Sequence, residues 1–244
     1  MTVLRSALFN LAFFALTALM SVLALPLLAA PRAWAVCVVR LWAGIVVAML
    51  RVICGVRVEV DGLDRIPPGA AVLAAKHQST FDTIIWLKLL PDAAYVLKKE
   101  LLSLPLYGWF CRKVGMIPVD RSGGGAALRS MLRAVQAALE AGRQVVIFPE
   151  GTRTAPGERV PYQPGVVAIA GASTAPDLPI ATNSGRIWGR RAFQKRPGRI
   201  RITVLPPLPP GLPRAQLIPA LENAIETESE RLLAVGELVD KTVG

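Results

Sequence analysis

The chain has few residues of the kinds that build metal sites or disulfide frameworks. Its 244 residues contain one histidine, His77, and three cysteines at wide spacing, Cys37, Cys54 and Cys111. This set offers neither paired cysteines nor the clustered His and Cys ligands of a zinc site. No G-x-S-x-G sequence occurs, which argues against the nucleophile elbow of the α/β-hydrolases. We therefore expect no metal, and the sparse cysteines fit a reducing compartment.

Charged residues are also scarce, at 18% of the chain against 53% apolar residues. Soluble globular proteins carry nearer a quarter charged residues, so the deficit indicates a lipid-facing part. The charge that is present is strongly one-sided, with 28 Lys and Arg against 17 Asp and Glu and a formal net charge of +11. Such a balance predicts an anionic partner, which leaves nucleic acid, acidic lipids, a phosphorylated substrate or an acidic carrier protein open.

The N-terminal part contains a long run without charge. Residues 6–30 form 25 uncharged positions. A helix of that length reaches roughly 37 Å, enough to cross a hydrocarbon core of about 30 Å. The run exceeds the apolar region of a signal peptide, so we expect a retained anchor rather than a cleaved leader.

A second apolar run, residues 34–54, carries Arg40 and Arg51. Arginine at mid-membrane is costly, so this run is expected to lie at the interface with its arginines snorkelling outward. A hairpin, one span with a surface helix, and two spans all remain open. The remaining basic residues follow both runs, which predicts a body on the cytoplasmic face of a bacterial-type inner membrane. We expect an anchoring segment over 1–54 and a catalytic domain over 55–244.

The body alternates strand and helix patterns. Short apolar or alternating runs predict strands at 56–60, 70–75, 93–97, 115–119, 144–148 and 200–205. Apolar residues at helical spacing predict helices at about 80–90, 126–140 and 215–235. The sequence thus predicts an α/β fold with a mixed sheet flanked by helices, preceded by a membrane-anchoring helical segment.

Polar residues follow the expected strand at 70–75 in the stretch "KHQSTFD". An imidazole accepts a proton near neutral pH when a carboxylate orients its other nitrogen, and Asp82 could do this for His77. Ser79 to Asp82 also reads as an S-x-x-D capping box, so Asp82 could instead cap the helix that follows. The two interpretations are compatible, and a purely structural histidine is the third.

Two further strands are followed by basic residues. The strand at 144–148 leads into "FPEGTR", where Arg153 suits a phosphate by bidentate hydrogen bonding. The plainer interpretation is a solvated turn with an internal Glu–Arg pair. The strand at 115–119 leads to Arg121, a second phosphate contact or one half of a surface Asp–Arg pair.

Together, these segments resemble the glycerolipid acyltransferase superfamily, specifically the 1-acyl-sn-glycerol-3-phosphate acyltransferases. The H-x-x-x-x-D block of that family matches His77 and Asp82, and its F-P-E-G-T-R block matches 148–153 throughout. Its glycine-to-arginine block matches 115–121, and a hydrophobic fourth block is matched loosely by 178–181. The resemblance covers about residues 55–205 in the order of the family.

The resemblance implies acyl transfer from an acyl thioester, acyl-CoA or acyl carrier protein, to the free sn-2 hydroxyl of 1-acyl-sn-glycerol 3-phosphate. The product would be phosphatidic acid, a step of phospholipid biosynthesis. It implies His77 as general base and Asp82 as its partner, with no cofactor beyond the thioester co-substrate. The residues implied to hold the glycerol phosphate are Glu150, Gly151, Thr152, Arg153 and Arg121.

Partners and rival functions remain to be separated. Residues 186–199 interleave basic and aromatic side chains, which suits an anionic lipid surface or an acidic acyl carrier protein. Nucleic acid is not expected. Lys76 is expected at the surface. The alternatives are the same chemistry on another lyso-lipid, such as a lyso-amino-acid lipid, a membrane-anchored serine hydrolase using Ser79, and a non-catalytic lipid-binding protein.

Overall fold

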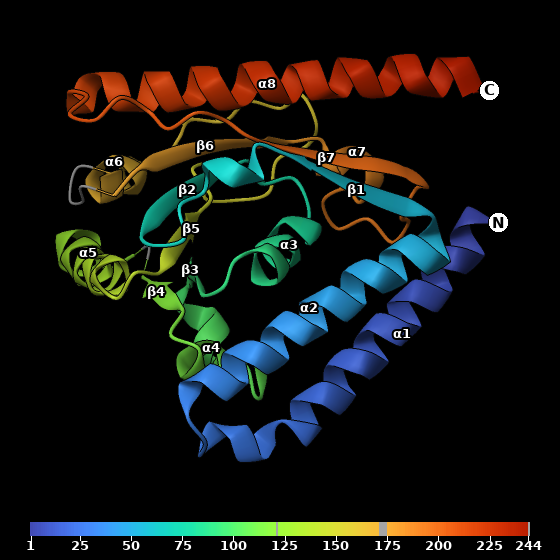
Figure 1. Cartoon of the computed structure of the whole chain (residues 1–244), viewed down its shortest axis with the longest axis horizontal. Helices are drawn as coiled ribbons and strands as arrows, with labels where there is room; N and C mark the ends of the chain where they lie inside the picture. Colours follow the sequence, from blue (N-terminus) through green and yellow to red (C-terminus); the bar gives the residue numbers. More distant parts are fainter. Residues whose placement is uncertain (121, 171–174, 244) are drawn as a thin grey trace.

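The computed structural model describes residues 1–120, 122–170 and 175–243 and centres on one mixed sheet (Figure 1). The sheet has the order β1-β7-β6-β2-β5-β3-β4. Neighbouring strands are parallel except for β6 and β7, which are antiparallel. The strands are β1 (Val56–Asp61), β2 (Ala71–Ala75), β3 (Ala93–Lys98), β4 (Ile117–Val119), β5 (Gln144–Ile147), β6 (Asp177–Thr182) and β7 (Gly198–Val204). The expected fold class, a mixed α/β sheet flanked by helices, is confirmed.

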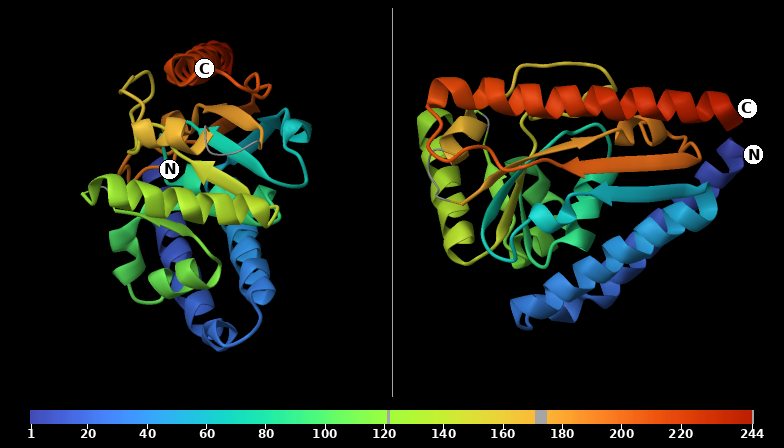
Figure 2. Two further views of the ribbon diagram at one scale, coloured as in Figure 1. Left: turned by 90° about the vertical axis from the view of Figure 1, so that its left-hand side faces the viewer. Right: turned by 45° about the horizontal axis from the view of Figure 1, so that its top comes forward.

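Helices cover both faces of this sheet (Figures 1 and 2). One core cluster joins the sheet to α1 (Thr2–Leu23), α2 (Arg32–Cys54), α3 (Phe81–Leu89) and α7 (Ser184–Ile187). A second cluster on the opposite face joins it to α5 (Gly124–Glu140), α6 (Pro164–Ala170) and α8 (Arg214–Val243). The remaining helical segments are α4 (Tyr107–Lys113) and the short 3-10 turns Leu25–Leu28, Leu63–Arg65 and Lys99–Ser103.

Strand β2 lies in the middle of the sheet and is buried along its whole length. Its side chains alternate between the two faces, as the pleat requires. Leu73 and Ala75 belong to the cluster on the α2 and α3 face, whereas Val72 and Ala74 belong to the cluster on the α5 and α8 face. If this alternation continues past the end of the strand, Lys76 points toward α8 and His77 toward α3.

Helices α1 and α2 form an antiparallel hairpin beneath the sheet (Figure 1). The sequence had suggested one helix over the uncharged run 6–30, but the structure interrupts this run. Helix α1 ends at Leu23, and Pro26 follows within a 3-10 turn, because proline lacks the amide that an α-helix needs and disfavours helical geometry just before it. Helix α2 ends at Gly55, whose φ of 69° is the left-handed conformation that glycine adopts most readily.

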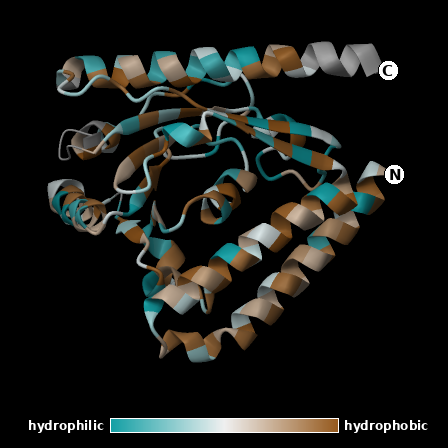
Figure 3. Ribbon diagram, viewed as in Figure 1, coloured by the Kyte–Doolittle hydropathy of each residue, from teal (hydrophilic) through white to brown (hydrophobic). Residues whose placement is uncertain are grey.

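The outer side of this hairpin is apolar and open (Figure 3). Both helices are long and apolar enough to cross a membrane, and only 11% and 22% of their most apolar windows are buried against the rest of the chain. A core helix of a soluble protein would be mostly covered. The exposed apolar side chains include Leu4, Leu8, Leu11, Phe14, Leu19, Trp34, Leu41 and Val52. This surface is suited to lipid contact.

The body differs from the sequence expectations in one strand and in several helices. Strand β6 was not predicted as a strand, because its apolar run is short and contains Pro179, which argues against a strand interior. Helices α4, α6 and α7 were also missed, since they span only seven, seven and four residues. The last helix, expected to end near 235, continues to Val243. All six predicted strands and all three predicted helices of the body are confirmed, with shifts of a few residues at some ends.

Candidate active site

The polar segments singled out in the sequence follow parallel strands that lie side by side. Strands β2, β5, β3 and β4 are consecutive in the sheet and parallel, so their carboxyl ends share one edge. His77 follows β2, and the block 148–153 follows β5, with Ala74 paired to Ile147 just before both. The two segments meet at this edge, where the N–H of Thr154 donates to the carbonyl of His77. Arg121 lies outside the described residues, two positions after the end of β4 at Val119.

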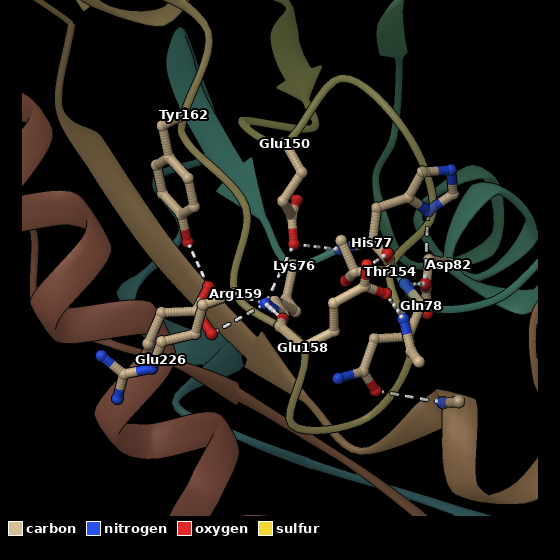
Figure 4. A network of polar contacts seen from close by, with 12 residues as sticks. Lys76, His77, Gln78, Asp82, Glu150, Thr154, Glu158, Arg159, Tyr162 and Glu226 are labelled. Atoms are coloured by element: carbon tan, nitrogen blue, oxygen red, sulfur yellow. Dashed lines mark hydrogen bonds and ion pairs between the residues drawn. The ribbon is translucent and has the colours of Figure 1, made fainter.

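His77 faces the carboxylate of Asp82 at this edge (Figure 4). The distance from His77 Nδ1 to Asp82 Oδ2 is 3.3 Å. The same oxygen accepts the backbone N–H groups of Gln78 and Ser79, each at 2.7 Å. Asp82 therefore does both things that the sequence allowed: it satisfies backbone donors ahead of α3, and it faces the imidazole. The two N–H donors hold this oxygen in place as an acceptor for Nδ1–H.

The imidazole of His77 packs flat against Phe148. The two ring centroids are 3.9 Å apart with 18° between the planes, and Tyr95 stacks on Phe148 in turn at 6.1 Å. The side chain of His77 keeps 10% of its surface exposed. Among the described residues its Nε2 atom has no hydrogen-bond partner. With Nδ1–H donated to Asp82, Nε2 is the atom able to accept a proton.

The block that follows β5 forms a tight turn beside His77. The N–H of Gly151 donates to the carbonyl of Phe148 at 2.9 Å, and Gly151 has a φ of 67°, which a side chain would strain. Thr154 then fixes the turn to the histidine: its N–H donates to the carbonyl of His77 at 2.8 Å and its Oγ1 at 3.3 Å. Thr152 is exposed. The sequence did not single out Thr154, which lies one position beyond the matched block.

Arg153 is half-buried near the His–Asp pair. Burial lowers the pKa of its guanidinium, the carboxylate of Asp82 raises it, and the positive charge of Arg190 lowers it again. Within the described part of the chain, Arg153 forms no hydrogen bond or ion pair. The internal Glu150–Arg153 pair, one interpretation of the sequence, is therefore not formed. A guanidinium with its donors unused, and a second cation nearby, suits an anion.

Glu150 lies behind His77 rather than at the surface. Its side chain is fully buried, its Oε1 atom is 3.2 Å from Lys76 Nζ, and the same oxygen accepts the backbone N–H of His77 at 3.4 Å. Burial raises the pKa of Glu150 to about 7, against the lowering effect of Lys76. The resemblance had placed Glu150 among the groups that hold substrate. In the structure, the side chain of Glu150 instead contacts Lys76 and the backbone of His77. The expectation of a surface Lys76 is wrong, because that side chain is 1% exposed.

The basic and aromatic segment 186–199 is partly used inside the protein. Trp188 and Lys195 are buried, and the ammonium of Lys195 lies 4.8 Å from the centre of the Trp188 ring and 5.4 Å from that of Phe9. The backbone N–H of Lys195 donates to Ser6 Oγ at 2.9 Å. These contacts fasten α1 to the domain. The exposed members of the segment, available to a lipid surface or a carrier, include Arg190, Arg191, Phe193 and Arg196.

The fold and the site together define a class of protein. A His–Asp pair and an arginine, Arg153, that has no ion-pair partner among the described residues lie at the carboxyl edge of a mixed sheet, and an apolar helical hairpin packs beneath that sheet. The pattern of the Acyltransferase family matches residues 57–183, which contain His77, Asp82 and the whole 148–153 block. The chain belongs to the acyltransferase family.

Particular relatives carry a more specific name. A 1-acyl-sn-glycerol-3-phosphate acyltransferase of Pseudomonas aeruginosa is 37% identical over 169 residues, 69% of this chain and 66% of that protein. The mouse 1-acyl-sn-glycerol-3-phosphate acyltransferase alpha is 32% identical over 175 residues, 70% of this chain and 61% of that protein. The matches thus span just under two thirds of these relatives. The crystal structure of the 1-acyl-sn-glycerophosphate acyltransferase PlsC from Thermotoga maritima shares the fold, with a TM-score of 0.79 at 21% identity over 96% of this chain and 98% of that one.

Proposed function

We propose that this protein transfers an acyl group from a thioester, acyl-CoA or acyl carrier protein, to the sn-2 hydroxyl of 1-acyl-sn-glycerol 3-phosphate, which yields phosphatidic acid for phospholipid synthesis. The observation that carries the proposal is the His77–Asp82 pair, 3.3 Å apart, beside Arg153, which forms no hydrogen bond or ion pair within residues 1–120, 122–170 and 175–243. The names of the relatives support the same acceptor. The thioester is a co-substrate, and the proposed reaction needs no bound metal or cofactor.

In the proposed reaction, His77 acts as general base. As the acceptor hydroxyl oxygen attacks the thioester carbonyl carbon, its proton moves to Nε2, while Nδ1–H remains bonded to Asp82. The tetrahedral intermediate then collapses, the carbon–sulfur bond breaks, and the thiolate leaves and takes up the proton from Nε2. The products are an ester and a free thiol. Holding hydroxyl and thioester together at the imidazole supplies much of the acceleration.

The acceptor phosphate is assigned to the rim of the site. Arg153 supplies the main cation, and Gly151 and Thr152 form the adjoining turn. Arg121, which lies outside the described residues, is proposed as a second cation because it follows β4 by two positions. Glu150 supports this set from behind by holding the His77 backbone and Lys76. A phosphorylated acceptor matches an arginine better than a neutral one does, which favours lysophosphatidic acid over a lyso-amino-acid lipid.

The serine hydrolase alternative finds no support at Ser79. This residue is fully buried, and its Oγ accepts the N–H of Phe81 at 3.1 Å at the start of α3. An attacking serine needs its hydroxyl exposed to substrate and bonded to a base. The Ser79 hydroxyl oxygen is instead bonded to the backbone at the start of α3.

We further propose that residues 1–54 anchor the catalytic domain, residues 55–244, by lying in one leaflet on the cytoplasmic face. Both ends of the hairpin are fastened to the domain. At one end Arg32 binds Asp92 through two hydrogen bonds of 2.7 and 2.6 Å, and Lys113 donates to the carbonyl of Leu28 at 2.9 Å. At the other end Ser6 binds Lys195. Helices held along the domain at both ends are poorly placed to cross the bilayer, and their open apolar side suits the leaflet interior.

The test is direct acyl transfer by the purified protein in lipid. Each lyso-acceptor is offered with acyl-CoA or acyl carrier protein, and thiol release is followed for the wild type and for His77→Ala. The expected result is transfer to 1-acyl-sn-glycerol 3-phosphate that falls by about 10²–10⁴-fold in His77→Ala. Preference for a non-phosphorylated acceptor, or full activity in His77→Ala, would overturn the proposal.

A further inference from the structure

A buried cluster of charges lies directly behind the histidine, and it includes a residue from the last helix (Figure 4). The ammonium of Lys76 is 2.6 and 2.7 Å from the two carboxylate oxygens of Glu226 on α8. It is also 3.2 Å from Glu150 and donates to the carbonyl of Glu158 at 3.3 Å. Glu226 accepts a further hydrogen bond from the hydroxyl of Tyr162 at 2.9 Å.

The position of Lys76 follows from the pleat of β2. Lys76 and His77 are consecutive in an extended segment, so they point to opposite faces of the sheet. The lysine side chain reaches the layer of α8, and the imidazole reaches the layer of α3, as Figure 4 shows. The ammonium of Lys76 has three N–H donors. Its acceptors lie on three residues: Glu226 on α8, Glu150 after β5, and Glu158, which accepts through its backbone carbonyl. Lys76, the residue directly before the proposed base, is thus bonded to three other parts of the chain.

The cluster is costly to bury. Lys76, Glu150 and Glu226 have side chains between 0% and 4% exposed. One ammonium faces two carboxylates, and the Oε2 atom of Glu150 is buried without a hydrogen-bond partner in the described structure. Buried ion pairs add little to stability compared with apolar residues of similar size, whereas the loss of one partner is strongly destabilising. Such a cluster directly beside a working side chain is better explained by a role in the site.

We propose that Glu226 is a positioning residue for His77. It holds Lys76 on the α8 face, so that Glu150 Oε1 remains available to the backbone N–H of His77 and the imidazole stays directed at Asp82. The proposal rests on the proposed function, with His77 as the base. It makes α8 part of the catalytic unit, although Glu226 lies outside the residues 57–183 that match the family pattern.

The neutral variant Glu226→Gln separates this role from simple packing. Without the charge at 226, Lys76 is left with Glu150 as its only carboxylate, and the pair is expected to close up and draw Glu150 away from His77. The expected result is a kcat lower by between about tenfold and a hundredfold, as for a misplaced catalytic group, with the acceptor KM within about twofold.

The same helix offers a matched control. Glu230 lies one turn further along α8 and forms an exposed pair with Arg159 at 2.6 Å. Glu230→Gln makes the same chemical change on the same helix outside the buried cluster. It is expected to leave kcat within about twofold, because exposed ion pairs contribute little.

A second readout does not depend on activity. His77 is the only histidine in the chain, so ¹⁵N-labelled histidine gives NMR signals from this ring alone. In the wild type and in Glu230→Gln, the tautomer with the proton on Nδ1 is expected to dominate. In Glu226→Gln the Nδ1 and Nε2 signals are expected to move toward mixed tautomers while the circular dichroism stays that of a folded protein. A role in packing alone would lower the melting temperature and leave the signals of the folded protein unchanged.

The outcomes separate the two proposals. If Glu226→Gln keeps wild-type kcat and wild-type ring signals, the positioning role is overturned. If the wild type and Glu230→Gln transfer no acyl group to any acceptor, the proposed function fails, and the ring signals alone decide the role of Glu226. If Glu226→Gln does not fold, Tyr162→Phe decides instead, because it removes one hydrogen bond to Glu226 and keeps every charge. A shift of the ring signals in Tyr162→Phe supports the proposal, and unchanged signals overturn it.

Discussion

The Oδ2 atom of Asp82 faces Nδ1 of His77 at 3.3 Å while the same oxygen accepts two backbone N–H groups at 2.7 Å. Those two donors, from Gln78 and Ser79, hold the carboxylate in place beside the imidazole. One oxygen therefore joins the start of α3 to the proposed base. A change at Asp82 should affect the orientation of the base more than the binding of substrate.

We expect Asp82→Asn to lower kcat by about 10²–10⁴-fold and to change the acceptor KM little. The amide keeps an oxygen for the two backbone donors, but it lacks the charge that stabilises the protonated imidazole. Steady-state thiol release at varied acceptor concentration measures both constants. Retention of more than a third of wild-type kcat by a folded Asp82→Asn protein would contradict this assignment.

Ser79→Ala should leave acyl transfer within about twofold of the wild type. The variant loses the hydrogen bond from the Phe81 N–H to Ser79 Oγ, so the free energy of unfolding should fall by about 1 kcal/mol. Thermal unfolding followed by circular dichroism measures that loss, and thiol release measures the activity. Complete inactivation together with an acyl adduct on Ser79, detected by mass spectrometry, would instead support a serine nucleophile.

Arg153→Ala should raise the KM for 1-acyl-sn-glycerol 3-phosphate by about 10–100-fold. A hydrogen bond to a charged group contributes about 1.5–3 kcal/mol, and Arg153 has no competing partner in the described part of the chain. Arg159→Ala is the matched control, because Arg159 is exposed and already paired with Glu230 at 2.6 Å. Equal effects of the two variants on KM would count against a phosphate site at Arg153.

Asp177 at the start of β6 allows a pH test of the fold away from the proposed base. Burial raises the pKa of this carboxyl from 3.8 to about 6, and its Oδ1 atom is buried without a partner in the described structure. Between these two values the folded protein holds a proton that the unfolded chain has already released. Its contribution to stability is therefore present at low pH and declines as the pH rises through about 6.

Asp177→Asn should remove that decline. We expect the melting temperature of the variant minus that of the wild type to increase between pH 4 and pH 7 and then level off. A gain of about 3 kcal/mol, or roughly 6–12 °C, is expected on the plateau. Other titrating groups, such as Glu150, occur in both proteins and cancel in the difference. A difference independent of pH would show that Asp177 does not titrate in this range.

The sequence by itself determined the parts of this protein that depend on local pattern. The apolar runs predicted two apolar helical segments before the body, and short periodic segments predicted most strands and the mixed sheet, because each strand or helix face repeats over a few residues. His77, Asp82 and Arg153 were found in short blocks that follow strands. Parallel neighbouring strands then bring the blocks of β2 and β5 to one edge.

Only the tertiary structure decided which groups support that edge. Lys76 reads as a surface residue until its partner Glu226, 150 positions away, is placed against it by α8. Glu150 reads as a substrate ligand until the turn at Gly151 directs its side chain inward, and Lys195 reads as a lipid-binding cation until α1 covers it. The physical reason is the same in each case. Burial and charge pairing depend on segments far apart in the chain. Local periodicity therefore does not predict which acidic residue forms an ion pair with a given cation.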